Sequence, residues 1–453
     1  MNNLANILRR SGVVGAGGAG FPAYAKLSPE TKFLLANGAE CEPLLDKDQV
    51  VMTNYPELVL EGMQQVITAS SANKGIVAVK SKNNKSIAAL KGKISSTDRP
   101  VEVFELPDIY PVGDEVVLIY EVLKKVIGPG ALPGTVQTQV NNVETLMNIA
   151  LAVRGQPVTD KFVTISGWVK EPATIKLPVG TTIKKALEMA GGVTESKFEV
   201  ILNGLMMGDR LTDLDQPVTK TTSAILVLSP KHPVVIHKQK NLAAMIKLAR
   251  SVCTSCFQCS ETCPRRLLGH PVQPHLVMRA VGYNSLPDDV FELREEVAKT
   301  YETAGYCVEC GVCELVCPMG LSPRIVSAYI KHLLPRAERS ELGSVTPLGT
   351  REGLKMPTSR LYQKLGISEL KDRPLPFREA DRGMVKKTRL LLKQGIGKPA
   401  VPVVETGQRV NKGEMVANLP KEQLGTALHA SIHGKVTIVT AHEIVIEESG
   451  ETV

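Results

Sequence analysis

Eight of the nine cysteines fall in one stretch and carry the clearest chemistry of the chain. They form two runs of one spacing, Cys253-x2-Cys256-x2-Cys259-x3-Cys263-Pro264 and Cys307-x2-Cys310-x2-Cys313-x3-Cys317-Pro318. Three thiolates of such a run hold one [4Fe–4S] cluster, and the fourth reaches the other cluster. Soft thiolate ligands suit iron–sulfur chemistry. The sequence therefore predicts two clusters, one on Cys253, Cys256, Cys259 and Cys317, the other on Cys307, Cys310, Cys313 and Cys263.

Zinc and disulfide bonds are the alternatives for a cysteine-rich segment. Zinc sites usually pair two C-x-x-C units a dozen or more residues apart, often with histidine, and this spacing differs. His270 and His275 lie between the runs, but eight thiolates already complete two clusters, so we expect both histidines to be structural. No secretory signal is evident, which favours metal over disulfides and a reducing, cytoplasmic compartment.

A glycine-rich stretch, Gly15 to Pro22, is the second candidate site. Without Cβ atoms, its backbone amides can approach an anion closely. Gly15, Gly17 and Gly20 satisfy G-x-G-x-x-G, but a lone match of this kind is weak. No Gly-Lys-Ser/Thr follows, so this is not a Walker loop. A phosphate-binding loop and a plain flexible turn both remain open.

Three more segments place amide and carboxyl side chains beside predicted helix starts. They are NGAECEP (37–43) after the apolar run FLLA, YPVGDE (110–115) and NNVET (141–145). Helix amino ends favour anions, and such side chains can contact flavin edges and ribose hydroxyls. Each segment taken alone is better explained by helix capping or a surface turn. Together with two clusters they indicate a flavin site.

The elements that must position these residues begin with an α/β unit, residues 1–157. Runs at 76–80 and 101–106 are predicted strands, and 56–70 and 115–128 are predicted amphipathic helices. The alternation of strands and helices is typical of an α/β domain.

Four units follow along the chain. Residues 158–235 predict a small β-rich domain wrapped on one helix, in the manner of a β-grasp, and residues 240–338 carry the cysteines between helical stretches. Residues 339–385 are rich in proline and arginine with few apolar runs, which predicts an extended linker or a segment that wraps around the other domains. Residues 386–453 alternate in strand fashion with glycine punctuation, which predicts a small barrel-like sandwich.

Composition excludes several classes of protein. The 453 residues are 43% hydrophobic and 22% charged, a globular composition, and no apolar run approaches the roughly 18 residues of a membrane span. Aromatic residues make up only 4%, which is thin for a nucleic-acid binder that works by stacking. The net charge of +8 is spread along the chain, as expected for a solvated surface or for attraction to anionic cofactors or an acidic redox partner. We expect no membrane segment and no nucleic-acid partner.

The pieces GAGGAGFPAYAK, NGAECEP, YPVGDE and NNVET together resemble the flavin- and NADH-binding subunit family of respiratory complex I, and more closely the RnfC family. The resemblance implies a multidomain α/β fold with a Rossmann-like FMN/NADH domain, a β-grasp (SLBB) domain, a helical two-cluster ferredoxin domain and a C-terminal barrel-sandwich hybrid. It implies FMN contacts at Gly15, Gly17, Lys26, Asn37, Glu40, Gly113, Asp114, Asn141, Asn142 and Thr145, and NADH contacts at Phe21, Glu42 and Glu115.

Three residues depart from the complex I pattern, where Ala16 replaces arginine, Ala39 replaces aspartate and Asp114 replaces glutamate. These changes concern nucleotide binding more than flavin binding. No side chain is expected to act as nucleophile, general acid or general base, because the cofactors carry the chemistry.

The C-terminal unit resembles lipoyl and biotinyl domains, but its hairpin, Asn418 to Glu422, lacks their carrier-lysine motif. In RnfC this unit stands at the amino end. Its place here, with the chain length, is similar to the cobalamin reductase family of propanediol-utilisation bacterial microcompartments. That resemblance implies electron transfer from NADH through FMN and two clusters to cob(III)alamin or cob(II)alamin for coenzyme B12 recycling. It also implies an adenosyltransferase and shell proteins as partners, and a microcompartment location. An RnfC-like electron-transfer subunit of a membrane complex, and an electron-transfer adaptor that binds no NADH, remain as alternatives.

Overall fold

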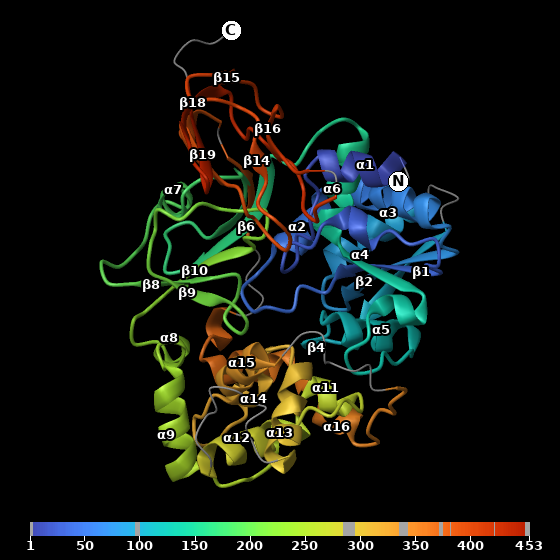
Figure 1. Ribbon diagram of the computed structural model, residues 1–453, viewed down its shortest axis with the longest axis vertical. Coiled ribbons are helices and arrows are strands. Elements are labelled where there is room, and N and C mark those ends of the chain that lie inside the picture. Colours follow the sequence, from blue (N-terminus) through green and yellow to red (C-terminus); the bar gives the residue numbers. More distant parts are fainter. Residues whose placement is uncertain are drawn as a thin grey trace.

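The computed structural model describes residues 3–95, 100–283, 295–334, 343–370, 375–380, 382–420 and 422–448. Figure 1 shows four parts: the N-terminal α/β domain in blue to teal, the β-grasp domain in green, the helical cysteine domain in yellow to orange, and the C-terminal β domain in red. The two β domains adjoin at one side, and the cysteine domain lies below the N-terminal and β-grasp domains in this view. No helix within the described ranges is long and apolar enough to span a membrane.

The N-terminal domain has three layers around a parallel sheet of order β3-β2-β1-β5. Side chains alternate along a strand, so Leu34 packs with the helices of one face and Leu35 with those of the other. The strands are β1 (Phe33–Gly38), β2 (Lys74–Lys80), β3 (Val101–Leu106) and β5 (Thr138–Asn142). One face carries α2 (Lys47–Asn54), α3 (Pro56–Ser70), α4 (Asn84–Ile94) and α6 (Val143–Val153), and the other carries α5 (Glu115–Leu123).

The strand order places a switch point between β1 and β5. The chain passes from β1 to β2 and β3 on one side, then returns to β5 on the other side of β1. Ligands of open α/β sheets bind beyond the carboxyl ends of strands at such a point. Helix α5 ends before the predicted residue 128, because Lys124 adopts a left-handed conformation. Smaller elements are α1 (Asn3–Arg10), η1 (Ala23–Lys26), β4 (Ile109–Tyr110) and η2 (Pro133–Val136).

The β-grasp domain is a six-stranded sheet of order β12-β7-β6-β10-β8-β9, with α7 packed on it. Its first strands, β6 (Asp160–Gly167) and β7 (Ala173–Pro178), pair antiparallel. The other elements are α7 (Ile183–Met189), β8 (Glu199–Leu202), β9 (Asp209–Leu211), β10 (Ala224–Leu228) and β12 (Phe377–Glu379).

The cysteine domain is helical, with a core that includes Met245, Val277, Tyr301 and Val326. Its elements are α8 (Pro233–Lys238), α9 (Leu242–Val252), α10 (Gln258–Glu261), α11 (Pro264–Leu267), α12 (Pro274–Tyr283), α13 (Glu295–Glu302), η4 (Thr303–Tyr306), α14 (Val312–Leu315) and α15 (Pro323–Leu333).

Within the described part of the segment 339–385, short helices and strands between residues 351 and 384 pack against other domains, which fits the wrap-around alternative rather than an extended linker. The segment forms α16 (Arg351–Leu354), β11 (Met356–Pro357), α17 (Thr358–Leu365), η6 (Ser368–Leu370), β12 and η7 (Arg382–Met384). Strand β11 pairs with β4, and β12 pairs with β7. Leu361 and Leu365 of α17 are buried beside Cys310. Strand pairing and a few buried apolar residues at helical spacing thus hold this segment against three domains. So few apolar residues do not predict a helix from the sequence.

The C-terminal domain packs two small sheets, of orders β13-β19-β18-β15 and β14-β16-β17, around one apolar core. Lys220 of the β-grasp domain donates hydrogen bonds to Gly12 O (2.7 Å) and Ala427 O (3.0 Å), which joins three domains at one point. Lys421 of the hairpin lies outside the described residues. The strands are β13 (Lys387–Leu391), β14 (Val401–Pro402), β15 (Arg409–Val410), β16 (Met415–Asn418), β17 (Leu428–His429), β18 (Gly434–Val439) and β19 (Glu443–Glu447).

Candidate functional site

The glycine-rich loop lies against the carboxyl end of β5 and the start of α6. The backbone N–H of Ala16 donates to Thr145 Oγ1 at 2.9 Å, and Gly15 N donates to Phe21 O at 2.9 Å, which closes the loop. A Cβ atom on Gly17 would lie 2.9 Å from Asn142 Nδ2, so this approach requires glycine. The loop and NNVET, far apart in sequence, therefore share the edge at the β1/β5 switch point, here named the β1/β5 edge.

Residues from the other segments complete the β1/β5 edge. Asn37, at the end of β1, donates from Nδ2 to Gly113 O at 2.9 Å. Lys26 Nζ donates to Val140 O at 3.0 Å and lies 3.4 Å from Glu115 Oε1. The side chains of Lys26 and Glu115 are about one-third exposed, at 32% and 39%, so their charged ends remain accessible to a ligand.

Some predicted contact residues use their polar atoms within the protein. Asp114 caps α5 by accepting from Val117 N at 3.1 Å, and its other oxygen pairs with Arg265 at 2.9 Å. Asn141 accepts a hydrogen bond from Gln139, and Asn142 Oδ1 accepts from Glu144 N. These side chains shape the β1/β5 edge through protein contacts.

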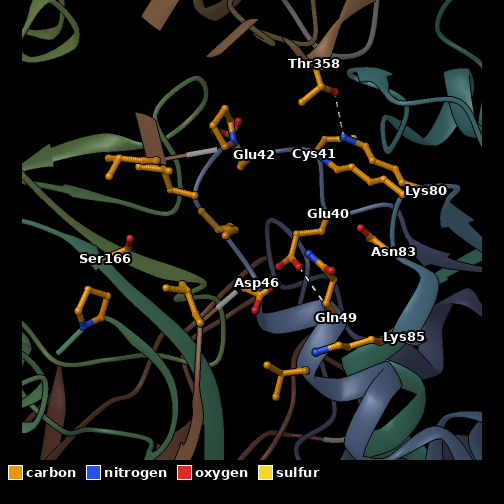
Figure 2. A pocket seen from close by; sticks show the side chains of 18 of the residues that line it. Glu40, Cys41, Glu42, Asp46, Gln49, Lys80, Asn83, Lys85, Ser166 and Thr358 are labelled. Atoms are coloured by element: carbon orange, nitrogen blue, oxygen red, sulfur yellow. Dashed lines mark hydrogen bonds between the residues drawn. The ribbon is translucent and has the colours of Figure 1, made fainter. Parts of the chain in front are cut away.

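Glu40 and Glu42 accept hydrogen bonds from backbone amides outside the glycine-rich loop. Glu40 accepts from Asp48 N (3.0 Å) and Gln49 N (3.3 Å) at the start of α2, and burial raises its pKa to about 8. Glu42 accepts from Met206 N (2.9 Å) and Met207 N (3.0 Å), so it joins the N-terminal domain to the β-grasp domain. Burial also raises the pKa of Glu42. Both residues line a cavity beside the β1/β5 edge (Figure 2).

A buried ion network beneath the glycine-rich loop was absent from the sequence analysis. Lys47 Nζ lies 2.5 Å from Asp48 Oδ1 and 3.3 Å from Glu144 Oε2, and Lys161 pairs with the same Glu144 oxygen. The network supports the loop from two sides, because Lys161 donates to Ala16 O (3.3 Å) and Asp48 accepts from Asn142 Nδ2 (3.0 Å). Lys161 belongs to β6 of the next domain. The ion network could not be predicted from the sequence, because its charged residues are isolated within apolar segments.

The cysteines fall into two groups of four, each around its own small cavity. Cys253, Cys256, Cys259 and Cys317 line one cavity. Cys263, Cys307, Cys310 and Cys313 line the other. These are the two crossed ligand sets that the spacing predicts. Burial, followed by repulsion from neighbouring thiolates, raises the pKa of Cys259. A thiolate set of this kind needs a bound cation to stay ionised, and four thiolates are the donor set of a [4Fe–4S] cluster.

The second cysteine set lies against the N-terminal domain. Tyr110 donates to the backbone oxygen of Cys310 at 2.7 Å, and Arg265, two residues after Cys263, forms the ion pair with Asp114. His270 has a structural partner here, because Nε2 donates to Ile127 O at 2.9 Å. Cys256 of the first set is exposed to solvent. The second set thus neighbours the β1/β5 edge, and the first set faces outward.

Comparison with known proteins agrees with this arrangement. Residues 8–151 match the model of the Nuo51 FMN-binding domain, and residues 162–209 match the SLBB domain. Residues 252–322 match the 4Fe-4S dicluster domain, and residues 380–453 match the RnfC barrel sandwich hybrid domain. The predicted fold class is confirmed, as are an FMN-binding domain and an iron–sulfur domain.

One similarity extends over nearly the whole chain. Cobalamin reductase PduS of Salmonella typhimurium is 38% identical over 443 residues, which cover 97% of this chain and 95% of that protein. The chain belongs to the PduS family. PduS of Citrobacter freundii is 39% identical over the same length. A component of the proton-translocating ferredoxin:NAD(+) oxidoreductase complex of Clostridium ljungdahlii is 35% identical over 273 residues, 59% of this chain and 57% of that one. The similarity to PduS thus includes segments that the match to the Clostridium protein leaves out.

Proposed function

We propose that this protein is an NADH-dependent cobalamin reductase that contains FMN and two [4Fe–4S] clusters and serves coenzyme B12 recycling in propanediol degradation. The observation that carries the proposal is the similarity over 97% of the chain to proteins named cobalamin reductase. The β1/β5 edge and the two cysteine sets support it, because they supply sites for a flavin and for both clusters within one chain.

The cofactors determine what the residues must do. NADH gives up two electrons as a hydride, an iron–sulfur cluster accepts one electron at a time, and a bound flavin can exchange electrons in either way. The protein must therefore bind the flavin beside NADH on one side and beside a cysteine set on the other.

The chain's own groups suit these tasks. Backbone amides of the glycine-rich loop and the amino end of α6 favour the flavin phosphate. The ammonium of Lys26 adds a positive charge at the β1/β5 edge, and Asn37 holds the backbone of Gly113 in place. We assign Gly15, Gly17, Lys26, Asn37, Gly113, Asn142 and Thr145 to FMN binding, and Phe21 and Glu115 to NADH binding. Arg265 and Tyr110 keep the second cysteine set next to this edge.

The test is anaerobic purification followed by measurement of iron, sulfide and FMN, and of NADH-driven cobalamin reduction. We expect about eight irons and one FMN per chain, as two cubanes and one flavin require, with turnover of cobalamin. Transfer to ferredoxin without cobalamin turnover would favour an RnfC-like subunit. A protein with both cofactors that does not oxidise NADH would be an adaptor.

A pair of glycine variants tests the flavin site itself. Gly17→Ala introduces a Cβ atom 2.9 Å from Asn142 Nδ2 and should lower FMN content. Gly18→Ala is the matched control, since its Cβ would have no neighbour within 4 Å. Equal FMN content in both variants would contradict the assignment.

Location and partners follow from the same proposal. We place the protein in the cytoplasm within a bacterial microcompartment, with an adenosyltransferase and shell proteins as its neighbours. Co-purification with isolated microcompartments, and its loss when the shell is disrupted, would test this placement.

A further inference from the structure

A cavity of about 770 Å³ lies between the N-terminal domain, the β-grasp domain and the segments 358–370 and 375–377 (Figure 2). It opens over the ends of β1 and β2, on the side of β1 away from β5. The glycine-rich loop, Lys26 and Glu115 are not among its lining residues. The cavity is therefore separate from the β1/β5 edge, to which the flavin is assigned.

The amino end of helix α4 forms one side of this cavity. The first N–H groups of a helix lack intrahelical acceptors, and their dipoles attract anions. Lys85, in the first turn of α4, lines the cavity, and its charge acts on Asp46 of the same lining by lowering the pKa of that carboxyl against the larger effect of burial. Lys82 also lines it, and its Nζ lies 3.3 Å from Asp108. Lys80 also lines the cavity and pairs with Asp108, so three lysines stand here against that one carboxylate and this side of the cavity carries a net positive charge.

A buried amide gives a second, independent indication of a ligand. Asn83, at the N-cap of α4, is only 6% exposed and lines the cavity. Its backbone groups are bonded to Lys80 and Ile87, but its side chain has no hydrogen-bond partner within the described part of the chain. Its amide atoms are not sealed off from the cavity, so they can form hydrogen bonds with a ligand there. Figure 2 shows Asn83 and Lys85 on the same side of the cavity, opposite Ser166.

The remaining lining suits an organic group. Leu370, Leu375 and Phe377 supply apolar surface. Four carboxyl groups also line the cavity. Burial raises the pKa of Glu42, that of Asp46 to about 7 and that of Glu40 to about 8, so near neutral pH these three groups carry less than their full negative charge and oppose a bound anion less. The fourth, Asp108, has a lowered pKa despite its burial, because Lys80 and Lys82 lie beside it.

We propose that this cavity binds a phosphate-bearing organic ligand, with its phosphate at the amino end of α4 against Asn83, Lys82 and Lys85 and its organic part against the apolar wall. The inference rests on the proposed function for its two candidate ligands. Cobalamin carries a phosphodiester in its nucleotide loop, and NADH carries a pyrophosphate. Both present the same chemistry to α4.

Calorimetric titration of the full chain, loaded with FMN and clusters, tests the proposal. The probes are cobalamin against cobinamide, which has the corrin ring but no phosphate, and NADH against reduced nicotinamide riboside, which also has none. Lys85→Met and Asn83→Ala should each weaken binding of one phosphate-bearing probe about tenfold or more, as loss of a charge-assisted or buried hydrogen bond does. The control is Lys91→Met on the same helix, whose exposed ammonium pairs with Glu105.

The outcomes separate the two ligands. Weaker binding of cobalamin but not of cobinamide assigns the cavity to the corrinoid, and weaker binding of NADH but not of the riboside assigns it to the dinucleotide. Unchanged affinity for both phosphate-bearing probes, or equal losses for the phosphate-free probes, would overturn the proposal. A protein that binds NADH here but never reduces cobalamin would refute the proposed function and leave the cavity assignment standing.

Discussion

Replacing Glu144 by glutamine tests whether the buried ion network positions the glycine-rich loop. The Glu144 side chain is fully buried, and both Lys47 and Lys161 pair with it. The network of these three residues and Asp48 is neutral, with two ammonium groups and two carboxylates. Glu144→Gln leaves a buried net charge of +1 beneath the loop.

The expected loss of stability follows from that charge. Removing one partner of a buried ion pair costs about 3–5 kcal/mol, because the other charge remains buried. Glutamine keeps an oxygen that can accept from Phe162 N, so we expect the lower end, about 3 kcal/mol. Adding Lys161→Met restores neutrality, and the double variant should therefore be more stable than the sum of the two single changes predicts, by about 1–2 kcal/mol.

Urea unfolding measures the free energy of unfolding of each variant, and fluorescence titration with FMN measures the affinity of the glycine-rich loop for the flavin. FMN affinity should fall in Glu144→Gln, because Lys161 also holds Ala16 O. The control is Glu57→Gln, which removes an exposed ion pair between Glu57 and Lys93. Its loss should change the free energy of unfolding by less than about 1 kcal/mol. If Glu144→Gln costs no more than this control, or if the effects of the double variant simply add, the reasoning fails.

Three further predictions concern the clusters, the domain contact and pH. Cys317→Ser and Cys253→Ser should abolish the same cluster signal in electron paramagnetic resonance and leave about four irons, because both thiols line one cavity; loss of different signals would disprove the crossed sets. Arg265→Met should slow reduction of the clusters in stopped-flow experiments without changing FMN content, because it removes the ion pair with Asp114; an unchanged rate would show that the pair is dispensable. Burial raises the pKa of Asp46 to about 7, so the folded protein loses stability relative to its protonated form as pH rises from about 4 through 7 and Asp46 ionises. The melting temperature of Asp46→Asn should therefore rise relative to that of the wild type across this window and keep a constant advantage above pH 8. Melting temperatures that change in parallel with pH in the two proteins would contradict the raised pKa.

The sequence predicted those features that depend only on residues close together in the chain. The x2-x2-x3 spacing of the cysteines is set by short stretches of chain, so it anticipated which thiols surround each cavity. The segments NNVET and YPVGDE stand at helix starts because Asn142 and Asp114 cap those helices. Neither inference needed knowledge of distant contacts.

Features that depend on contacts between distant residues were missed. Lys161 meets Glu144 only after two domains pack together, and the two backbone amides that donate to Glu42 belong to the β-grasp domain, far from it in sequence. The predicted linker contains α17, whose apolar side chains are buried in one cluster with Cys310 and Leu226. Tertiary packing, rather than any local pattern, fixes these roles.

The crossed cysteine sets have a consequence for how the protein matures. Cys263 and Cys317 each complete a set whose other three thiols lie in the opposite run. During synthesis, no four-thiol site exists until Cys313 has left the ribosome, and the other site follows as soon as Cys317 emerges. The biosynthetic machinery that delivers iron and sulfide therefore meets both sites at nearly the same moment, and a chain truncated between the two runs could retain neither cubane.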